Sequence, residues 1–173
     1  MNELNKLTLL ISKPEHFEYF FKNLKRTDLF DWLNQELHVF DQIPEPKVTD
    51  DGKYIQFPQW WPGRYLIKVA DRIPEKVFSV IKNIKTENHL ALDDCSKAVL
   101  QMPQDFLNRN FKDINKLCDK WLEVKYVGFI YYQAADLLKK YIESKNFDGA
   151  IDLFDVLSKV KKIDKEESKF RFE

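Results

Sequence analysis

One line of this sequence occurs twice, first as Pro14-Glu15-His16-Phe17-Glu18-Tyr19-Phe20-Phe21-Lys22-Asn23-Leu24 and again as Pro74-Glu75-Lys76-Val77-Phe78-Ser79-Val80-Ile81-Lys82-Asn83-Ile84. Phe17, Phe20, Phe21 and Leu24 recur at the i, i+3, i+4 and i+7 spacing of one helix face. Proline is favoured in the first turn of a helix, so each copy predicts an amphipathic helix that begins at its Pro-Glu pair. Such repetition is typical of stacked helical units, because a single unit cannot bury its own apolar face. The expected fold class is therefore all-α.

The composition agrees with packed helices. The chain has 173 residues, of which 14% are aromatic and four are glycine, so it can form one domain with a hydrophobic core. Its 28 basic and 28 acidic residues leave no net charge, which argues against a general nucleic-acid binder. Cys95 and Cys118 stand in no Cys-x-x-Cys or Cys/His pattern, so we expect buried thiols and no zinc site.

No targeting or membrane segment is evident in the sequence. Residues 1–12 lack a basic n-region and a small-residue cleavage site. No apolar run approaches the roughly 20 residues that span a bilayer. We therefore expect a cytoplasmic protein that does not enter the membrane.

Local start and stop signals divide the chain into further helices. Ser12 and Glu15 form a capping-box pattern, Thr27 is positioned to cap a short second helix, and Pro62 opens a third. The stretch over residues 3–11 suits a short helix or an extended arm. Asn88 and Asn146 are expected N-caps. The remaining apolar stripes predict helices over residues 90–102, 111–122, 129–142 and 147–157.

One long segment, residues 38–61, breaks the helical period. Pro44, Pro46 and Pro58 stand in it, and the turn signal Asp50-Asp51-Gly52 lies near its middle. Residues 54–57 are either a brief strand or an extended strip laid over the helices. A loop of this length in a compact domain is either functional or packed down by its own side chains.

The densest group of candidate functional residues follows this loop. Trp60, Trp61, Arg64 and Tyr65 lie within six positions, and these residue types dominate binding hot spots. Two adjacent tryptophans cannot face the same way, so we expect one to be buried and the other to lie at a rim. A cation in the first turn of a helix requires an anionic partner.

Two interpretations of this group remain open. In the first, Arg64 pairs with Asp50, Asp51 or a neighbouring helix, and the tryptophans clamp the loop to the domain. In the second, the four residues form a recognition surface for a peptide, nucleotide or protein partner.

No motif predicts catalysis, a metal or a cofactor. His16, His38 and His89 are scattered, so we expect them on helix surfaces or in loops. Asp93 and Asp94 suggest a divalent-ion site, but their side chains would diverge by roughly 100° on a helix and could not chelate one ion together. We therefore expect a solvated face there. Neither a nucleophile elbow nor a phosphate-binding glycine loop is present. We therefore expect a non-enzymatic protein.

The domain organisation follows from these patterns. Residues 1–160 are expected to form one helical domain, and residues 161–173 a charged tail. Basic and acidic residues alternate in this tail, so it is a poor phosphate binder. The tail is either a frayed terminus or the truncated start of a next element.

The Pro-marked helix pairs resemble an irregular HEAT-type α-solenoid of antiparallel helix pairs. The line Trp61-Pro62-Gly63-Arg64-Tyr65-Leu66, with Val69-Ala70 and Ile73-Pro74-Glu75-Lys76-Val77 after it, is similar to helical-repeat segments of large uncharacterised bacterial proteins. This resemblance implies a scaffold or recognition role. Unequal repeat lengths and the long loop over residues 38–61 depart from a regular array.

The sequence therefore favours a non-enzymatic interaction or scaffold module that binds a protein partner. The alternative is a regulatory or accessory helical domain of a larger nucleotide-dependent or nucleic-acid-processing protein, for example one in defence.

Overall fold

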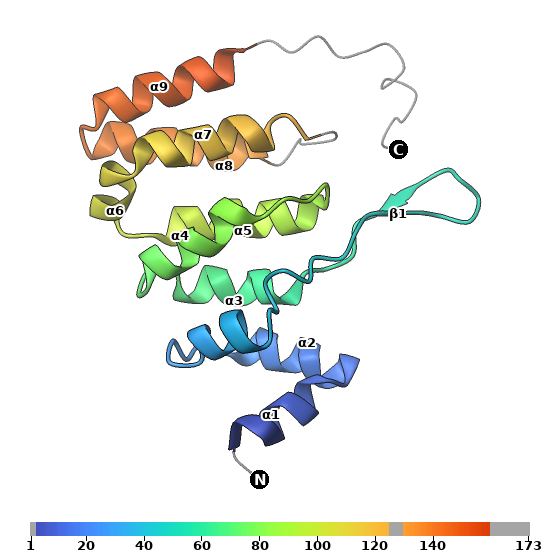
Figure 1. Ribbon diagram of the computed structural model, residues 1–173. Helices are drawn as coiled ribbons and strands as arrows, with labels where there is room; N and C mark the ends of the chain where they lie inside the picture. The colour runs from blue at the N-terminus through green and yellow to red at the C-terminus, as the bar shows by residue number, and fades with distance from the viewer. Residues whose placement is uncertain (1–2, 125–129, 160–173) are drawn as a thin grey trace.

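The protein is mostly helical. The computed structural model describes residues 3–124 and 130–159 (Figure 1). Ten helices account for most of these residues, which confirms the all-α expectation. A two-stranded sheet of β1 (Lys47–Val48) and β2 (Ile55–Gln56) interrupts the helices. The helices are α1 (Glu3–Ile11), α2 (Pro14–Asn23), the π-helix η1 (Trp32–Glu36), α3 (Trp61–Val69), α4 (Pro74–Asn83), α5 (His89–Gln101), α6 (Gln104–Arg109), α7 (Phe111–Trp121), α8 (Ile130–Glu143) and α9 (Phe147–Ser158).

The helices lie one above another, with α1 at one end of the stack and α9 at the other (Figure 1). Helix α2 contacts α3, α3 contacts α5, and α5 contacts α8. Helix α9 contacts both α7 and α8. A single cluster of buried apolar side chains runs through the stack from Ile11 to Leu153. The helices therefore share one core along the length of the described chain.

The two copies of the repeated line form helices of equal length, α2 and α4. Each has its proline in the first turn, and each ends at an extended residue with nearly the same backbone angles, φ −65° and ψ 128° at Leu24 and φ −66° and ψ 128° at Ile84. Each contacts the α-helix before it and the one after it, which are α1 and α3 for α2 and are α3 and α5 for α4. The repeated line thus specifies the same local start and stop at two places in the stack.

The expected capping box is wrong. No side chain caps α2, and the Ser12 hydroxyl instead donates to the backbone carbonyl of Leu9 at 2.8 Å. Because α1 continues to Ile11, the Ser12 side chain bonds to the last turn of that helix and does not cap the start of α2.

The short helix expected after Thr27 is present, but it starts later and takes the π-helical form η1, in which Trp32 and Leu33 are buried. The chain forms a turn in which the Phe30 amide donates to the Thr27 carbonyl at 3.1 Å, and only then enters η1. Phe30 is buried against two other aromatic rings, with its ring centre 5.3 Å from that of Phe40 and 6.2 Å from that of Tyr65. Phe30, Phe40 and Tyr65 therefore form a buried aromatic cluster beside the start of this helix.

The long loop contains a β-hairpin that projects from the side of the stack (Figure 1). Its strands are antiparallel, with Lys47 opposite Gln56 and Val48 opposite Ile55. The predicted turn is confirmed, because Gly52 has a φ of +70°, which glycine adopts without strain. Of the two alternatives for residues 54–57, the brief strand is correct for Ile55 and Gln56.

Asn88 fastens the base of this hairpin to the stack. Its side-chain amide donates to the carbonyl of Pro44 at 2.7 Å and to that of Pro58 at 2.8 Å. Its carbonyl oxygen accepts from the Leu90 amide at 3.0 Å, which confirms the predicted cap of α5. One buried side chain therefore holds both ends of the loop against the first turn of α5.

Three other expectations can be compared with the structure. Both cysteines are free and buried, as predicted, and burial raises the pKa of the Cys118 thiol to about 12. His89 is buried and stacks on Phe57 with ring centres 4.3 Å apart, so its expected place on a surface is wrong.

None of the described helices combines the length and the apolar character that crossing a bilayer requires. The predicted tail over 161–173 lies outside the described residues.

Candidate interaction site

Two of the four candidate residues, Trp60 and Tyr65, belong to the core. Trp60 is the N-cap residue of α3 and is 1% exposed, and Tyr65 is fully buried one turn later. The Tyr65 hydroxyl donates to the backbone carbonyl of Arg26 at 2.8 Å, and burial raises its pKa above the usual value. These two side chains therefore hold the loop and α2 to the stack.

The other two, Trp61 and Arg64, reach the surface. Trp61 is half-buried, and the Lys22 ammonium lies 4.6 Å from the centre of its ring, within the range of a cation–π contact. The Arg64 side chain is 40% exposed. The expected divergence of the two tryptophans is therefore confirmed, with Trp60 inside and Trp61 at the rim.

Arg64 pairs with a neighbouring helix, which was one option in the first interpretation. Its Nε lies 3.3 Å from Oδ1 of Asp94, on α5, and the Asp94 side chain is fully buried. Gln59 completes the group, because its amide donates to Oδ2 of Asp94 at 3.1 Å and its oxygen accepts from Arg64 at 3.4 Å. We call Gln59, Arg64 and Asp94 the Asp94 cluster.

The structure overturns the expectation that Asp93 and Asp94 lie on a solvated face. Asp94 is fully buried and Asp93 is 8% exposed. Their side chains do diverge, because Asp94 points to α3 while Asp93 accepts from Gln133 of α8 at 2.8 Å. Lys97, 2.5 Å from Asp93, completes that second group. Both carboxylates are buried because α5 lies between α3 and α8, and the sequence of α5 alone does not specify this.

The electrostatics of Asp94 follow from its burial. Removal from water raises the pKa of its carboxyl group to about 6, and the nearby Asp93 adds to the rise. The Arg64 guanidinium, Lys97 and the hydrogen bond from Gln59 oppose it. Oδ1 of Asp94 has the ion pair with Arg64 but accepts no hydrogen bond, and Nε1 of Trp60 has no hydrogen-bond partner among the described residues. The cluster is therefore a buried charge that its partners stabilise incompletely.

Gly63 permits the close approach of α3 and α5 at this cluster. A Cβ atom there would lie 2.6 Å from the Trp60 ring and 2.9 Å from Cβ of Asp94. We therefore expect Gly63→Ala to lower the free energy of unfolding by about 1–3 kcal/mol, because the added methyl group overpacks the contact. Urea denaturation followed by circular dichroism measures this difference. Gly52→Ala is a poor comparison because of its positive φ. Ala135→Gly, at an exposed position of α8, therefore serves to measure the general effect of helix propensity.

Sequence reasoning found Trp61 and Arg64 but missed Gln59, Asp94 and Gln133. A partial signal for Asp94 was present, because it stands four residues from both Leu90 and Ala98 of the apolar stripe and so shares their helix face. No group of three or more His, Cys, Asp or Glu side chains in the described part of the chain is arranged to hold a metal ion. The arrangement presents an indole and a guanidinium at a rim, which suits recognition of another molecule.

The sequence matches no known protein-family model, and comparison with curated proteins and with solved structures finds no significant similarity. Function is therefore argued from the geometry of this chain.

Proposed function

We propose that this chain is a non-enzymatic interaction module with the architecture of an irregular HEAT-type α-solenoid, and that it binds a protein partner. The observation that carries the proposal is the order of contacts in the stack, in which α3 contacts α5 and α5 contacts α8. In solenoids each unit contacts its neighbours in the same way, and the resulting long surface is used for binding.

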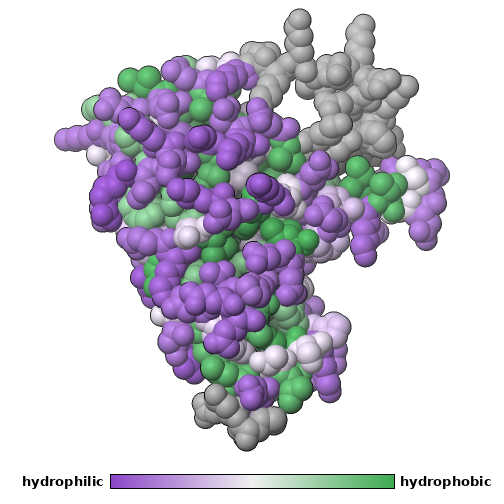
Figure 2. All heavy atoms as spheres, viewed as in Figure 1, coloured by the Kyte–Doolittle hydropathy of each residue, from purple (hydrophilic) through white to green (hydrophobic). Residues whose placement is uncertain are grey.

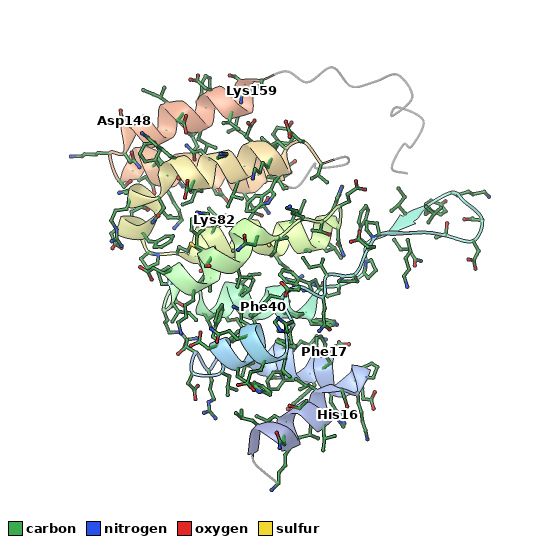
Figure 3. All side chains as sticks on the ribbon, viewed as in Figure 1. His16, Phe17, Phe40, Lys82, Asp148 and Lys159 are labelled. Atoms are coloured by element: carbon green, nitrogen blue, oxygen red, sulfur yellow. The ribbon has the colours of Figure 1, made fainter. Side chains whose placement is uncertain are left out.

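Ion pairs between the intervening helices support this arrangement. Lys82 of α4 lies 2.8 Å from Asp113 of α7, and Lys159, directly after α9, lies 3.1 Å from Asp119 of α7. Figure 3 labels both lysines, which lie on either side of the level that contains α7. Exposed pairs of this kind contribute only about 0–1 kcal/mol each. Their value here is that they join α4, α7 and the end of α9 into a second row beside α3, α5 and α8.

The proposed partner site is the rim formed by Trp61 and Arg64. Tryptophan and arginine are enriched among residues that dominate binding energy, especially where neighbouring side chains exclude water. Arg64 is held in place by the Asp94 cluster, so its side chain is ordered before a partner arrives. Such preorganisation reduces the entropy lost on binding.

A double variant tests this site. Trp61→Ala combined with Arg64→Lys removes the indole and the guanidinium but leaves a cation near Asp94. We expect at least an about tenfold loss of partner recovered by affinity capture from the native cell and mass spectrometry. Tyr132→Ala, which removes a more exposed aromatic ring from α8, is the matched control and is expected to retain the partner. Recovery of the same partner by the double variant would contradict the site.

The alternative, an accessory domain of a nucleic-acid-processing protein, gives a different result. It requires the isolated domain to bind DNA or RNA at about 50 mM salt and to release it as salt increases. The absence of net charge leads us to expect no such binding.

A further inference from the structure

Five cationic side chains lie on three successive levels of the stack, those of α2, α3 and α5 (Figure 1). Arg64 and Lys68 stand four residues apart on α3, so they share one face of that helix. Lys22 lies in the last turn of α2, Lys25 follows that helix, and Lys97 lies on α5. Each of the five is at least partly exposed. We call Lys22, Lys25, Arg64, Lys68 and Lys97 the basic row.

Direct contacts hold the α2 and α3 parts of the row together. The Lys68 ammonium donates to the backbone carbonyl of Phe21, in α2, at 3.2 Å. Partial burial lowers the pKa of this ammonium, and the neighbouring cations Lys25 and Arg64 lower it further. Cations held this close repel one another, and a bound anion would relieve the repulsion.

Buried carboxylates hold the α3 and α5 parts of the row from beneath. Arg64 pairs with the fully buried Asp94, and Lys97 lies 2.5 Å from Asp93, which is also buried. The two cations themselves remain partly exposed, at 40% and 42%. Nε and Nη2 of Arg64 contact Asp94 and Gln59, which leaves Nη1 for a ligand. In both pairs the negative charge lies inside and the positive charge faces solvent.

Acidic side chains do not cancel the row at the surface. Of the three carboxylates that pair with it, Asp93 and Asp94 are buried. Glu18 is the exposed one, and it lies 2.5 Å from Lys22. Two further ion pairs border the row and add no net charge, and these are Arg26–Asp28 and Arg72–Asp71. Five cations therefore face solvent against one exposed carboxylate that pairs with them.

Trp61 supplies an aromatic ring within the row, because the Lys22 ammonium lies 4.6 Å from the centre of that ring. Over the middle of the stack Figure 2 shows hydrophobic residues scattered among hydrophilic ones. The property that distinguishes the row is therefore its charge.

We propose that the protein partner presents an acidic segment, rich in aspartate or glutamate, that lies along the basic row and across Trp61. This inference rests on the proposed function, because it names the chemistry of the partner that would bind at Trp61 and Arg64. Complementary charge speeds association and fixes the orientation of the partner. The chain as a whole has no net charge, which favours a short acidic segment over the long, uniform charge of a nucleic acid.

The probe is a labelled peptide of about ten glutamates, and fluorescence anisotropy follows its binding to the full chain. We expect binding at about 20 mM salt and an about tenfold weaker affinity at about 150 mM salt, because salt screens the charges. A lysine peptide of the same length should not bind.

A pair of variants tests the position of the site. Lys25→Gln combined with Lys97→Gln removes a charge from each end of the row and should weaken binding of the glutamate peptide about fivefold. Lys112→Gln combined with Lys120→Gln makes the same change of net charge on exposed or partly exposed lysines of α7. This matched control should bind as the wild type does. Circular dichroism checks that both double variants remain folded.

Three results would overturn the inference. The first is a wild type that does not bind the glutamate peptide at about 20 mM salt. The second is an equal loss of affinity in the two double variants, since binding would then follow net charge and not the row. The third is tighter binding of a thymidine oligonucleotide of the same length, which would assign the row to nucleic acid.

Partner capture separates this inference from the proposed function. If Trp61→Ala with Arg64→Lys loses the partner, but the glutamate peptide does not displace that partner from the wild type, the proposed site stands and the acidic segment is wrong. If the same double variant retains the partner, the proposed site is wrong whatever the peptide does.

Discussion

Trp60→Ala is expected to lower the free energy of unfolding by about 3–5 kcal/mol, which is the usual effect of removing a buried tryptophan side chain. Trp60 is 1% exposed and contacts Gly63 at the point where α3 approaches α5. Its loss would leave a cavity between the loop and two helices of the stack. Urea denaturation followed by far-ultraviolet circular dichroism measures the effect without relying on tryptophan fluorescence.

Trp61→Ala is the control for this prediction, since it removes the same side chain one residue later. Trp61 is half-buried and contacts the Lys22 ammonium, so we expect a loss of only about 1–2 kcal/mol. Equal losses for the two variants would contradict the inward and outward orientations of the two rings. The comparison also separates structure from binding, because only the Trp61 variant is expected to lose a partner while it stays folded.

The second large effect is a dependence of stability on pH that arises from Asp94. Its pKa is about 6 in the folded protein and 3.8 in the reference state, so between these values the folded state binds more protons than the unfolded state. Stability therefore falls as pH rises through this window. The contribution is fully present below about pH 4 and is lost above about pH 6. A shift of this size corresponds to about 3 kcal/mol.

Asp94→Asn removes this titration and so tests it. The difference in free energy of unfolding between Asp94→Asn and the wild type should move in favour of the variant by about 2–3 kcal/mol between pH 4 and pH 7. Asp148→Asn makes the same change at an exposed position of α9 and should show a much smaller trend. A difference for Asp94→Asn that does not change with pH would show that its carboxyl group is not perturbed by burial.

Local signals in the sequence were reliable where a helix begins or ends for local reasons. Pro14 and Pro74 each occupy the first turn of a helix, and Asn88 and Asn146 each cap the helix that follows. These features depend on backbone dihedral angles and on hydrogen bonds over two or three residues. The capping box at Ser12 failed for the same reason, because the end of α1 lies equally close and takes the hydroxyl.

The candidate site was predicted only in part. The rule that adjacent tryptophans diverge was correct, but it did not tell which of Trp60 and Trp61 would be buried. Arg64 required an anion, and the sequence offered several. Asp94 is 30 positions away, and its selection depends on the crossing of α3 and α5 at Gly63.

By itself, then, the sequence determined the all-α class, the limits of most helices, the turn at Gly52 and the need for a counterion near Arg64. The tertiary structure alone decided that Trp60 is the buried one of the two tryptophans, that Asp93 and Asp94 are buried, and that Asn88 holds the hairpin. The physical reason is distance along the chain. Helix limits come from neighbouring residues, whereas burial and ion pairing are set by whichever helices pack together, and α5 is enclosed by α3 and α8 from distant parts of the sequence.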